Sequence, residues 1–379
     1  LYAASPLFNG NADYAKFANE DGTLLFAPKD DSKWGKAAAA AKEAIDKIEG
    51  SSYYGLYYSD EPDNGYRNYM ELFLPSKKWN KEYIFARNQG TGYSDNIHQE
   101  KCMAANGMGG WSGLCPTQEL VDAYEMANGS TPIIGYNADG TPIINGASGY
   151  SETGFAATAG KHYPAGVYNM YVGREPRFYA SINFNGQQWR GRQLEFWQGG
   201  KDGINVSKVD YCCTGYLLRK TADEGVDVIN GKGGMKEASI LFRVGSLYLD
   251  YAEALNEAEG PVDDVYKYVD AIRKRAGLPG LAKGLDKDKM RERIQHERQI
   301  ELAFEAGHRY FDCHRWKIAE KTDNGYMHGM NITATNKVDY SKRSTVGDSR
   351  VFEKKHYLFP IPQSEMDKRI GLVQSPYWE

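Results

Sequence analysis

The chain has 379 residues, with 46 Lys and Arg against 50 Asp and Glu and a formal net charge of -4. It carries no long basic run and so offers no source for the counterion release that drives binding to nucleic acid, which is therefore not expected as a partner. No stretch approaches the ~18 uncharged apolar residues that a membrane span needs.

Residues 33–49, KWGKAAAAAKEAIDKIE, predict a helix because they are rich in Ala, and Gly50 predicts its end. Residues 51–237 differ, since Gly, Asn, Tyr and Pro interrupt short apolar runs there. That texture predicts a loop-rich region with short strands. Within it, RFYASINFNGQQW alternates as a strand, and Asn185-Gly186 predicts a hairpin turn.

Helical periodicity returns at Ala238 and predicts a helical scaffold over residues 238–320. One apolar stripe, ended by Gly260-Pro261, consists of Val244, Leu247, Tyr248, Tyr251, Leu255 and Ala258. A second helix is marked by Val265, Val269, Ile272 and Ala276, and a third begins near Asp288. The first two together have the length of a tetratricopeptide-like helical hairpin. Residues 323–350 are expected to be turn-rich, and residues 357–366 to be an extended closing segment.

The stretch HERQIELAFEAGHRYFDCHRW at 296–316 is the strongest candidate for chemistry. Read as one helix, it places Glu301, Glu305 and Arg309 at successive i+4 steps, which predicts ion pairs within the helix. Asp312 and Arg315 follow at i+3. Two carboxylates on adjacent turns project side by side rather than across a substrate, so a scaffold role is favoured over acid-base hydrolysis.

We predict no metal site and no cofactor. His308 and His314 are six residues apart, and the H-E-x-x-H pattern is absent. The 5 cysteines form no C-x-x-C pair, which argues against a zinc ribbon and a dense disulfide framework. The sequence leaves open whether Cys102 and Cys115 pair.

Two aromatic segments are candidate ligand sites. The Gly-rich loop 107–113 lacks the spacing of a phosphate loop but presents Trp111, near Tyr93 and Asn96, and an exposed indole favours a binding role over core packing. The second segment combines Trp189, Phe196 and Trp197 with Arg190, Gln187 and Gln188. Aromatic faces with amide and guanidinium donors are typical of a sugar platform, although a strand with its hydrophobic side inward explains the same residues.

Several stretches together resemble the SusD-like (SusD/RagB) family of outer-membrane nutrient-binding lipoproteins of Bacteroidetes. They are LYAASPLFN at 1–9, PTQELVDAYEMANG at 116–129, REPRFYASINFNGQQW at 174–189, TGYLLRK at 214–220, FRVGSLYLDYAEALNEA at 242–258, IRKRAGL at 272–278, ERQIELAFEAGHRYFDCHRW at 297–316 and YLFPIPQSEM at 357–366. Their order covers nearly the whole chain.

This resemblance implies an all-α fold, a tetratricopeptide-like helical-repeat scaffold with a loop-rich irregular face carrying short strands. The chain is read as one domain, 1–379, without the family's amino-terminal portion and lipid anchor, with 51–237 facing the ligand and 238–320 as scaffold. The implied function is non-enzymatic. A glycan-binding protein on the outer surface of the outer membrane would pass oligosaccharide to a SusC-like TonB-dependent transporter.

The expected ligand residues are placed by loop location and chemistry: Trp111, Tyr93 and Asn96 first, then Trp189, Trp197 and Arg190. Peptide capture by the same kind of transporter lid remains an alternative, because backbone hydrogen bonds need no aromatic platform. A glycoside hydrolase would need a pair of cleft carboxylates, and a helical-repeat adaptor a broad apolar concave face. The sequence does not name the glycan.

Overall fold

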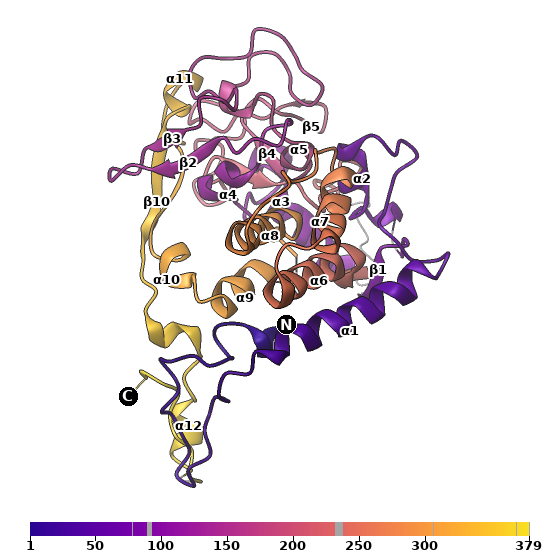
Figure 1. Cartoon of the computed structure of the whole chain (residues 1–379). Helices are drawn as coiled ribbons and strands as arrows, with labels where there is room; N and C mark the ends of the chain where they lie inside the picture. The colour runs from indigo at the N-terminus through magenta and orange to yellow at the C-terminus, as the bar shows by residue number, and fades with distance from the viewer. Residues whose placement is uncertain (78, 89–92, 232–237, 306, 369, 379) are drawn as a thin grey trace.

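The computed structural model describes residues 1–77, 79–88, 93–231, 238–305, 307–368 and 370–378 (Figure 1). Helices dominate it, and the strands are short, which confirms the predicted all-α class. The helices are α1 (Ser32–Glu49), α2 (Gly65–Glu71), α3 (Tyr93–Met103), α4 (Gln118–Ala123), α5 (Pro176–Ser181), α6 (Val244–Glu259), α7 (Asp263–Arg275), α8 (Lys287–Glu301), α9 (His308–Arg315), α10 (Ala319–Thr322), α11 (Lys337–Tyr340) and α12 (Gln363–Met366).

The strands join in antiparallel pairs rather than in one sheet. The pairs are β1 (Tyr83–Asn88) with β8 (Ala238–Arg243), β2 (Ile133–Tyr136) with β3 (Pro142–Ile144), β4 (Ile182–Phe184) with β7 (Tyr216–Leu218), β5 (Gln188–Trp189) with β6 (Arg192–Gln193), and β9 (Gly325–Met330) with β10 (Arg343–Arg350). Two-stranded pairs have little stability alone, so each depends on packing against the helices.

Helices α1, α6, α7 and α8 form the scaffold, with α6 packed against the other three (Figure 1). The predicted stripe on α6 is buried over most of its length, and it meets Ile45 of α1, Val269 of α7 and Ile294 of α8 in one core. Burying a side chain of this size stabilises the fold by about 1.5–3 kcal/mol relative to leaving it exposed. The helices predicted at 33–49 and over the 244–258 stripe are confirmed, and α6 with α7 forms the expected hairpin.

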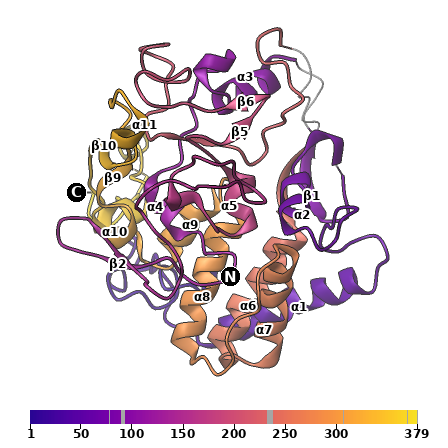
Figure 2. The ribbon, with the colours of Figure 1, turned by 90° about the horizontal axis from the view of Figure 1, so that it is seen from above.

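The loop-rich part lies beside this scaffold and has its own core (Figure 2). Its centre is aromatic. Tyr171 packs on Phe184 with ring centroids 4.4 Å apart, and Phe178 stacks on Phe184 at 5.4 Å. Offset and edge-on contacts between aromatic rings add to the burial of their area. Many of the chain's tyrosines therefore belong to this interior.

Four predictions of local structure are wrong. Residues 238–243 form strand β8, because they pair with β1 instead of opening the helix. The turn at Asn185-Gly186 forms, with the Gln187 N–H donating to the carbonyl of Phe184, but β4 pairs with β7. The two-residue hairpin follows at Arg190-Gly191, where both residues have positive φ, 46° and 85°, as a type I′ turn requires.

The third error concerns residues 296–316, which are not one helix. Helix α8 ends at Glu301, and α9 begins after Gly307. Between them Phe304 and Gly307 take left-handed φ values of 62° and 74°, which a continuing helix excludes. The β9–β10 pair within 323–350 was also not predicted, and the segment expected to be extended at 357–366 contains the short helix α12.

Candidate functional site

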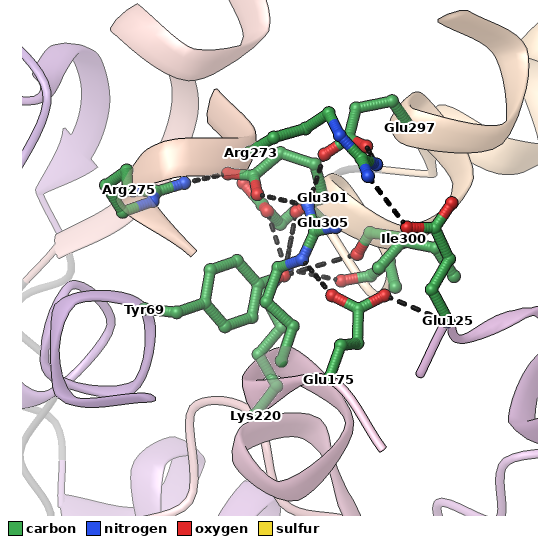
Figure 3. A network of polar contacts seen from close by, with 12 residues as sticks. Tyr69, Glu125, Glu175, Lys220, Arg273, Arg275, Glu297, Ile300, Glu301 and Glu305 are labelled. Carbon is green, nitrogen blue, oxygen red and sulfur yellow. Dashed lines mark hydrogen bonds and ion pairs between the residues drawn. The ribbon is translucent and has the colours of Figure 1, made fainter. Parts of the chain in front are cut away.

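Glu297, Glu301 and Glu305 of 296–316 belong to a buried network between α8, β8 and α7 (Figure 3). Glu301 is fully buried and receives hydrogen bonds from Arg177 at 3.1 Å and Arg243 at 2.9 Å, and another from Arg275. Arg243 also binds both oxygens of Glu305 at 2.8 Å. The Tyr69 hydroxyl donates to the Glu301 carbonyl at 2.8 Å.

Further buried pairs extend this network. Arg177 binds Glu175 at 2.7 Å and Glu297 at 2.5 Å, and Arg273 binds Glu297 at 3.1 Å. A neighbouring cluster joins Arg298 and Arg315 to Asp312, each at 2.8 Å. The predicted i+3 pair Asp312–Arg315 is thus confirmed, while the predicted i+4 pairs within one helix are replaced by bonds to distant segments.

The pKa shifts show what the network does. Burial would raise the pKa of Glu301, but Arg275, Arg243 and Arg177 outweigh it and lower that pKa to about 2. Burial raises the pKa of Glu175, yet this side chain is fully buried and bound to Arg177, so its carboxyl does not face a cleft. These groups hold elements together, as the scaffold interpretation expected, and they are not arranged as the acid and base of a hydrolase.

The loop that carries Trp111 folds back on α3. A Cβ at Gly110 would lie 2.1 Å from the Ala104 carbonyl oxygen, so only glycine allows this approach. Trp111 is 36% exposed, its ring stacks on His98 at 5.2 Å, and the Lys101 ammonium lies 5.3 Å from the ring centroid. The predicted exposure of the indole is confirmed. Tyr93 and Asn96 begin α3, but their side chains lie outside the described residues.

The second predicted platform is not exposed. Trp189 is 2% exposed and packs in the core of the loop-rich part. The alternative interpretation, a strand with its hydrophobic side inward, is therefore the correct one for Trp189. Arg190 donates to the carbonyls of Val226 at 3.0 Å and Asp223 at 2.9 Å and to Glu100 at 3.2 Å, a structural set of partners. Trp197 is partly buried against the same core.

A cavity of about 360 Å³ lies beside these residues, and its walls come from distant segments. Its lining includes Tyr66, Lys161, His162, Tyr163, Gln187, Gln188 and Arg219. We call this cavity the Tyr66 pocket. Its aromatic walls are ordered, since Tyr66 and His162 stack with centroids 4.8 Å apart and Tyr163 stacks on Tyr179 at 6.1 Å.

The surrounding fold fixes each wall. Gly65, before Tyr66, touches α7 so closely that a Cβ would lie 2.2 Å from the Ala276 carbonyl oxygen, which sets the position of α2. The 160–163 loop closes with a hydrogen bond from the Gly160 N–H to the Tyr163 carbonyl at 2.9 Å. Arg219 follows β7, where its Nη2 donates to the Tyr66 hydroxyl at 2.5 Å.

Two polar atoms on the pocket wall lack hydrogen-bond partners. They are Oε1 of Gln187 and Nε of Arg219, in side chains that are 5% and 7% exposed. An unsatisfied buried polar group costs about 1–3 kcal/mol, so native proteins keep few of them. Both atoms are themselves buried, in residues that line the cavity, so a ligand reaches them only after a shift of these side chains.

Sequence analysis identified Gln187 and Gln188 but missed the rest of this pocket. Tyr66, His162 and Arg219 lie in three separate segments, and none stands in a local pattern. Only the aromatic and amide composition near Trp189 indicated the right part of the chain.

A larger cavity of about 850 Å³ lies between the first residues, α1 and α8. Most of its charged groups are paired within the protein. Glu257 binds Arg291, Lys317 binds Asp13, and Glu253 accepts from the indole of Trp316 at 2.7 Å. The Tyr66 pocket, though smaller, is the better ligand site because it combines aromatic walls with amide and guanidinium groups.

The model of the SusD family matches residues 74–378. The chain belongs to the SusD family. Two curated relatives from Formosa agariphila are similar over parts of the sequence. SusD-like protein P25 is 42% identical over 82 residues, 21% of this chain and 15% of the relative, and SusD-like protein P2 is 29% identical over 154 residues, 38% and 26%. These matches cover well under two thirds of either relative.

Solved structures of the family share the fold. BT4246 aligns over 100% of this chain and 69% of its own, with 26% identity and a TM-score of 0.79. A SusD-like protein from Bacteroides fragilis, BF3747, aligns over 92% and 62%, with 26% identity and a TM-score of 0.67. A SusD-like carbohydrate binding protein from the same species, BF0978, has 22% identity over 89% of this chain and 60% of its own, with a TM-score of 0.64. The scaffold is the tetratricopeptide-like one of the SusD family.

All five cysteines of this SusD family member are free, so Cys102 and Cys115 are not bonded to each other. Cys115 Sγ lies 3.8 Å from Cys212 Sγ, a contact without a disulfide bond. Within the described ranges, no group of three or more His, Cys, Asp or Glu side chains is placed to hold a metal ion. Nor is any helix in those ranges long and apolar enough to cross a bilayer.

Proposed function

We propose that the protein captures oligosaccharides at the cell surface and delivers them to a SusC-like TonB-dependent transporter in the outer membrane, without cleaving them. It would act on the outer face of that membrane, held by a lipid anchor. Membership of the SusD family supports this role, since family proteins are outer-membrane lipoproteins that bind glycans and work with SusC-like transporters.

The Tyr66 pocket is the observation that carries the proposal. A pyranose ring has apolar C–H faces and a rim of hydroxyls, so it is bound by aromatic surfaces together with amide and guanidinium groups. The pocket offers all three, from Tyr163 and His162, Gln188, and Arg219. Its volume of about 360 Å³ is at the lower end of the range for small-ligand pockets and is suited to one or two sugar units.

Trp111 extends this site in the proposal. Glu100, which receives a bond from Arg190, lies on the same helix as His98, the ring on which Trp111 stacks. Arg190 and Arg219 both lie over the ring of Trp189, at 5.7 and 4.7 Å. Trp189 therefore contacts one arginine that is bound to α3 and another that lines the pocket, although it is not itself a binding surface.

Isothermal titration of the whole chain with plant, mucin and microbial oligosaccharides tests the proposal. We expect saturable heat with one glycan class and no new product by chromatography. Gln188→Ala should weaken binding at the pocket, and Trp111→Ala should weaken it for longer chains. Ser207→Ala, a small polar change elsewhere, serves as control.

Other outcomes would point elsewhere. Product formation would contradict a non-enzymatic role. Silence for every glycan combined with saturable binding of peptides would favour peptide cargo. The burial of Trp189 alone does not favour it, because Trp111 remains exposed.

A further inference from the structure

The charge on the wall of the Tyr66 pocket is one-sided. Its lining contains two cations, Lys161 and Arg219, and no Asp or Glu. The carboxylates nearby are already engaged. Glu224 accepts from Arg219 Nη2 at 3.0 Å and is half exposed, and Glu61 binds Arg67 at 2.5 Å. The lining itself therefore carries two positive charges, and Glu224, the carboxylate that pairs with Arg219, lies outside it.

Arg219 is prepared for an anion. Its guanidinium lies 4.7 Å from the centroid of Trp189 and 5.5 Å from that of Tyr66, so two rings fix its plane. Its Nη2 bonds Tyr66 and Glu224, while its Nε is buried and without a partner. A guanidinium held flat by aromatic rings loses little further entropy when it binds a carboxylate or sulfate oxygen.

The ring of His162 does not add a third charge to the pocket wall, and the shift of its pKa reflects the charges around it. Burial, together with the charges of Lys161 and Arg219, lowers its pKa to about 4. No carboxylate opposes them among the causes of that shift. At neutral pH the ring is uncharged, which leaves a flat apolar face next to Tyr66.

We propose that the Tyr66 pocket selects anionic sugars. The acid group of a uronic acid, or the sulfate of a sulfated sugar, pairs with the Arg219 guanidinium and with Lys161. A sugar hydroxyl donates to Gln187 Oε1, and the ring packs on the aromatic wall. This inference rests on the proposed function, since it names the class of glycan that the same site takes.

Matched ligands separate the charge from the sugar. We would titrate the whole chain with oligouronides, with the same oligomers as methyl esters, and with neutral and sulfated oligosaccharides of equal length. The acid form should bind roughly tenfold or more tightly than its ester, about the strength of one charge-assisted bond. That advantage should shrink as salt is raised, because exposed Lys161 is screened. Preference for the sulfated series over the uronides would identify the anion as sulfate.

Variants keep the test independent of folding. Arg219→Lys retains the positive charge but loses the planar guanidinium with its several N–H donors. Lys161→Gln removes an exposed charge without changing the core. Both should reduce the difference between acid and ester, whereas Lys208→Gln should not. A circular dichroism melt of each variant checks its fold.

The outcomes distinguish the two proposals. Equal or tighter binding of esters and neutral glycans would overturn the anionic selection and leave glycan capture standing. Binding of neither charged nor neutral glycans would overturn glycan capture itself. An acid preference that persists unchanged in both variants would show that the anion is read elsewhere and would contradict the assignment to this pocket.

Discussion

The buried network and the Tyr66 pocket both place arginine beside tyrosine, yet they treat its hydrogen bonds differently. In the network, Arg243 binds Glu82, Glu301 and Glu305. The Tyr69 hydroxyl donates to the backbone carbonyl of Glu301 (Figure 3). In the pocket, Arg219 keeps Nε without a partner. Arg275 of the network also has a buried Nε without a partner, so an unpartnered Nε does not by itself mark a site. The two arginines differ in their carboxylate partners: Arg243 binds three and holds segments together, whereas Arg219 pairs with Glu224 and lines a cavity.

The largest effect should come from breaking the network. Glu301→Gln keeps the shape but removes the anion between Arg275 and Arg243, and an uncompensated buried charge costs about 3–5 kcal/mol. The urea midpoint at pH 7, followed by tryptophan fluorescence, should fall sharply. Glu43→Gln, which loses an exposed pair with Lys47, should leave the midpoint unchanged. Equal midpoints for the two variants would contradict the scaffold role.

Acid should weaken the same contact in the wild type. The pKa of Glu301 is about 2 in the fold and near 4.5 when unfolded, so the unfolded chain binds the proton first. Its contribution is complete above pH 4.5 and is lost as the pH falls through 2, by roughly 3 kcal/mol from the shift. Urea titrations from pH 6 to 2.5 should therefore bring wild type and Glu301→Gln closer together. If the difference between the two urea midpoints does not change with pH, the effect of Glu301→Gln does not come from loss of the carboxylate charge.

A smaller effect should follow from displacing α2. Gly65→Ala forces a Cβ to within 2.2 Å of the Ala276 carbonyl oxygen, and overpacking of this kind costs about 1–3 kcal/mol. The melting temperature should drop, and glycan affinity should fall with it because Tyr66 moves. Gly35→Ala, with open space at its Cβ, is the matched control and should keep both. Loss of stability without loss of affinity would show that Tyr66 does not shape the site.

The smallest change in stability should occur in the pocket itself. Gln187→Leu removes a buried oxygen that has no partner in the fold, so the melting temperature should hold or rise slightly. Affinity for the bound glycan should fall by roughly tenfold, the value of about one hydrogen bond to ligand. Calorimetry and a thermal melt on the same sample give both values. A clear fall in melting temperature would mean that Gln187 is structural.

The sequence was a good guide where a pattern repeats over several turns. The apolar periodicity of α1, α6 and α7 predicted these helices correctly because each helix buries its apolar face. Strands β9 and β10 carry polar residues such as His328 and Thr345, so no apolar alternation marked them. The break at Phe304 was hidden because residues on both sides of it favour helix.

The candidate site was predictable only in part for the same reason. Trp111 stands out because glycine surrounds it, and its exposure followed from that. Trp189 lies inside because it packs in the core of the loop-rich part and against Arg219, which follows the distant strand β7. Tyr66 and His162 meet only after the chain has folded, and no spacing in the sequence records their contact.

The network also constrains the order in which the chain can be completed. Glu82 finds its cations at Arg243 and Arg275, and Glu175 lies in the same network as Glu297 and Glu301. A nascent chain that ends before residue 243 carries the acids of Glu82, Glu125 and Glu175 without most of the arginines that neutralise them. Contacts between residues so far apart in sequence form slowly, so the buried network should form late during folding. For the same reason, fragments of the chain should not fold as independent units.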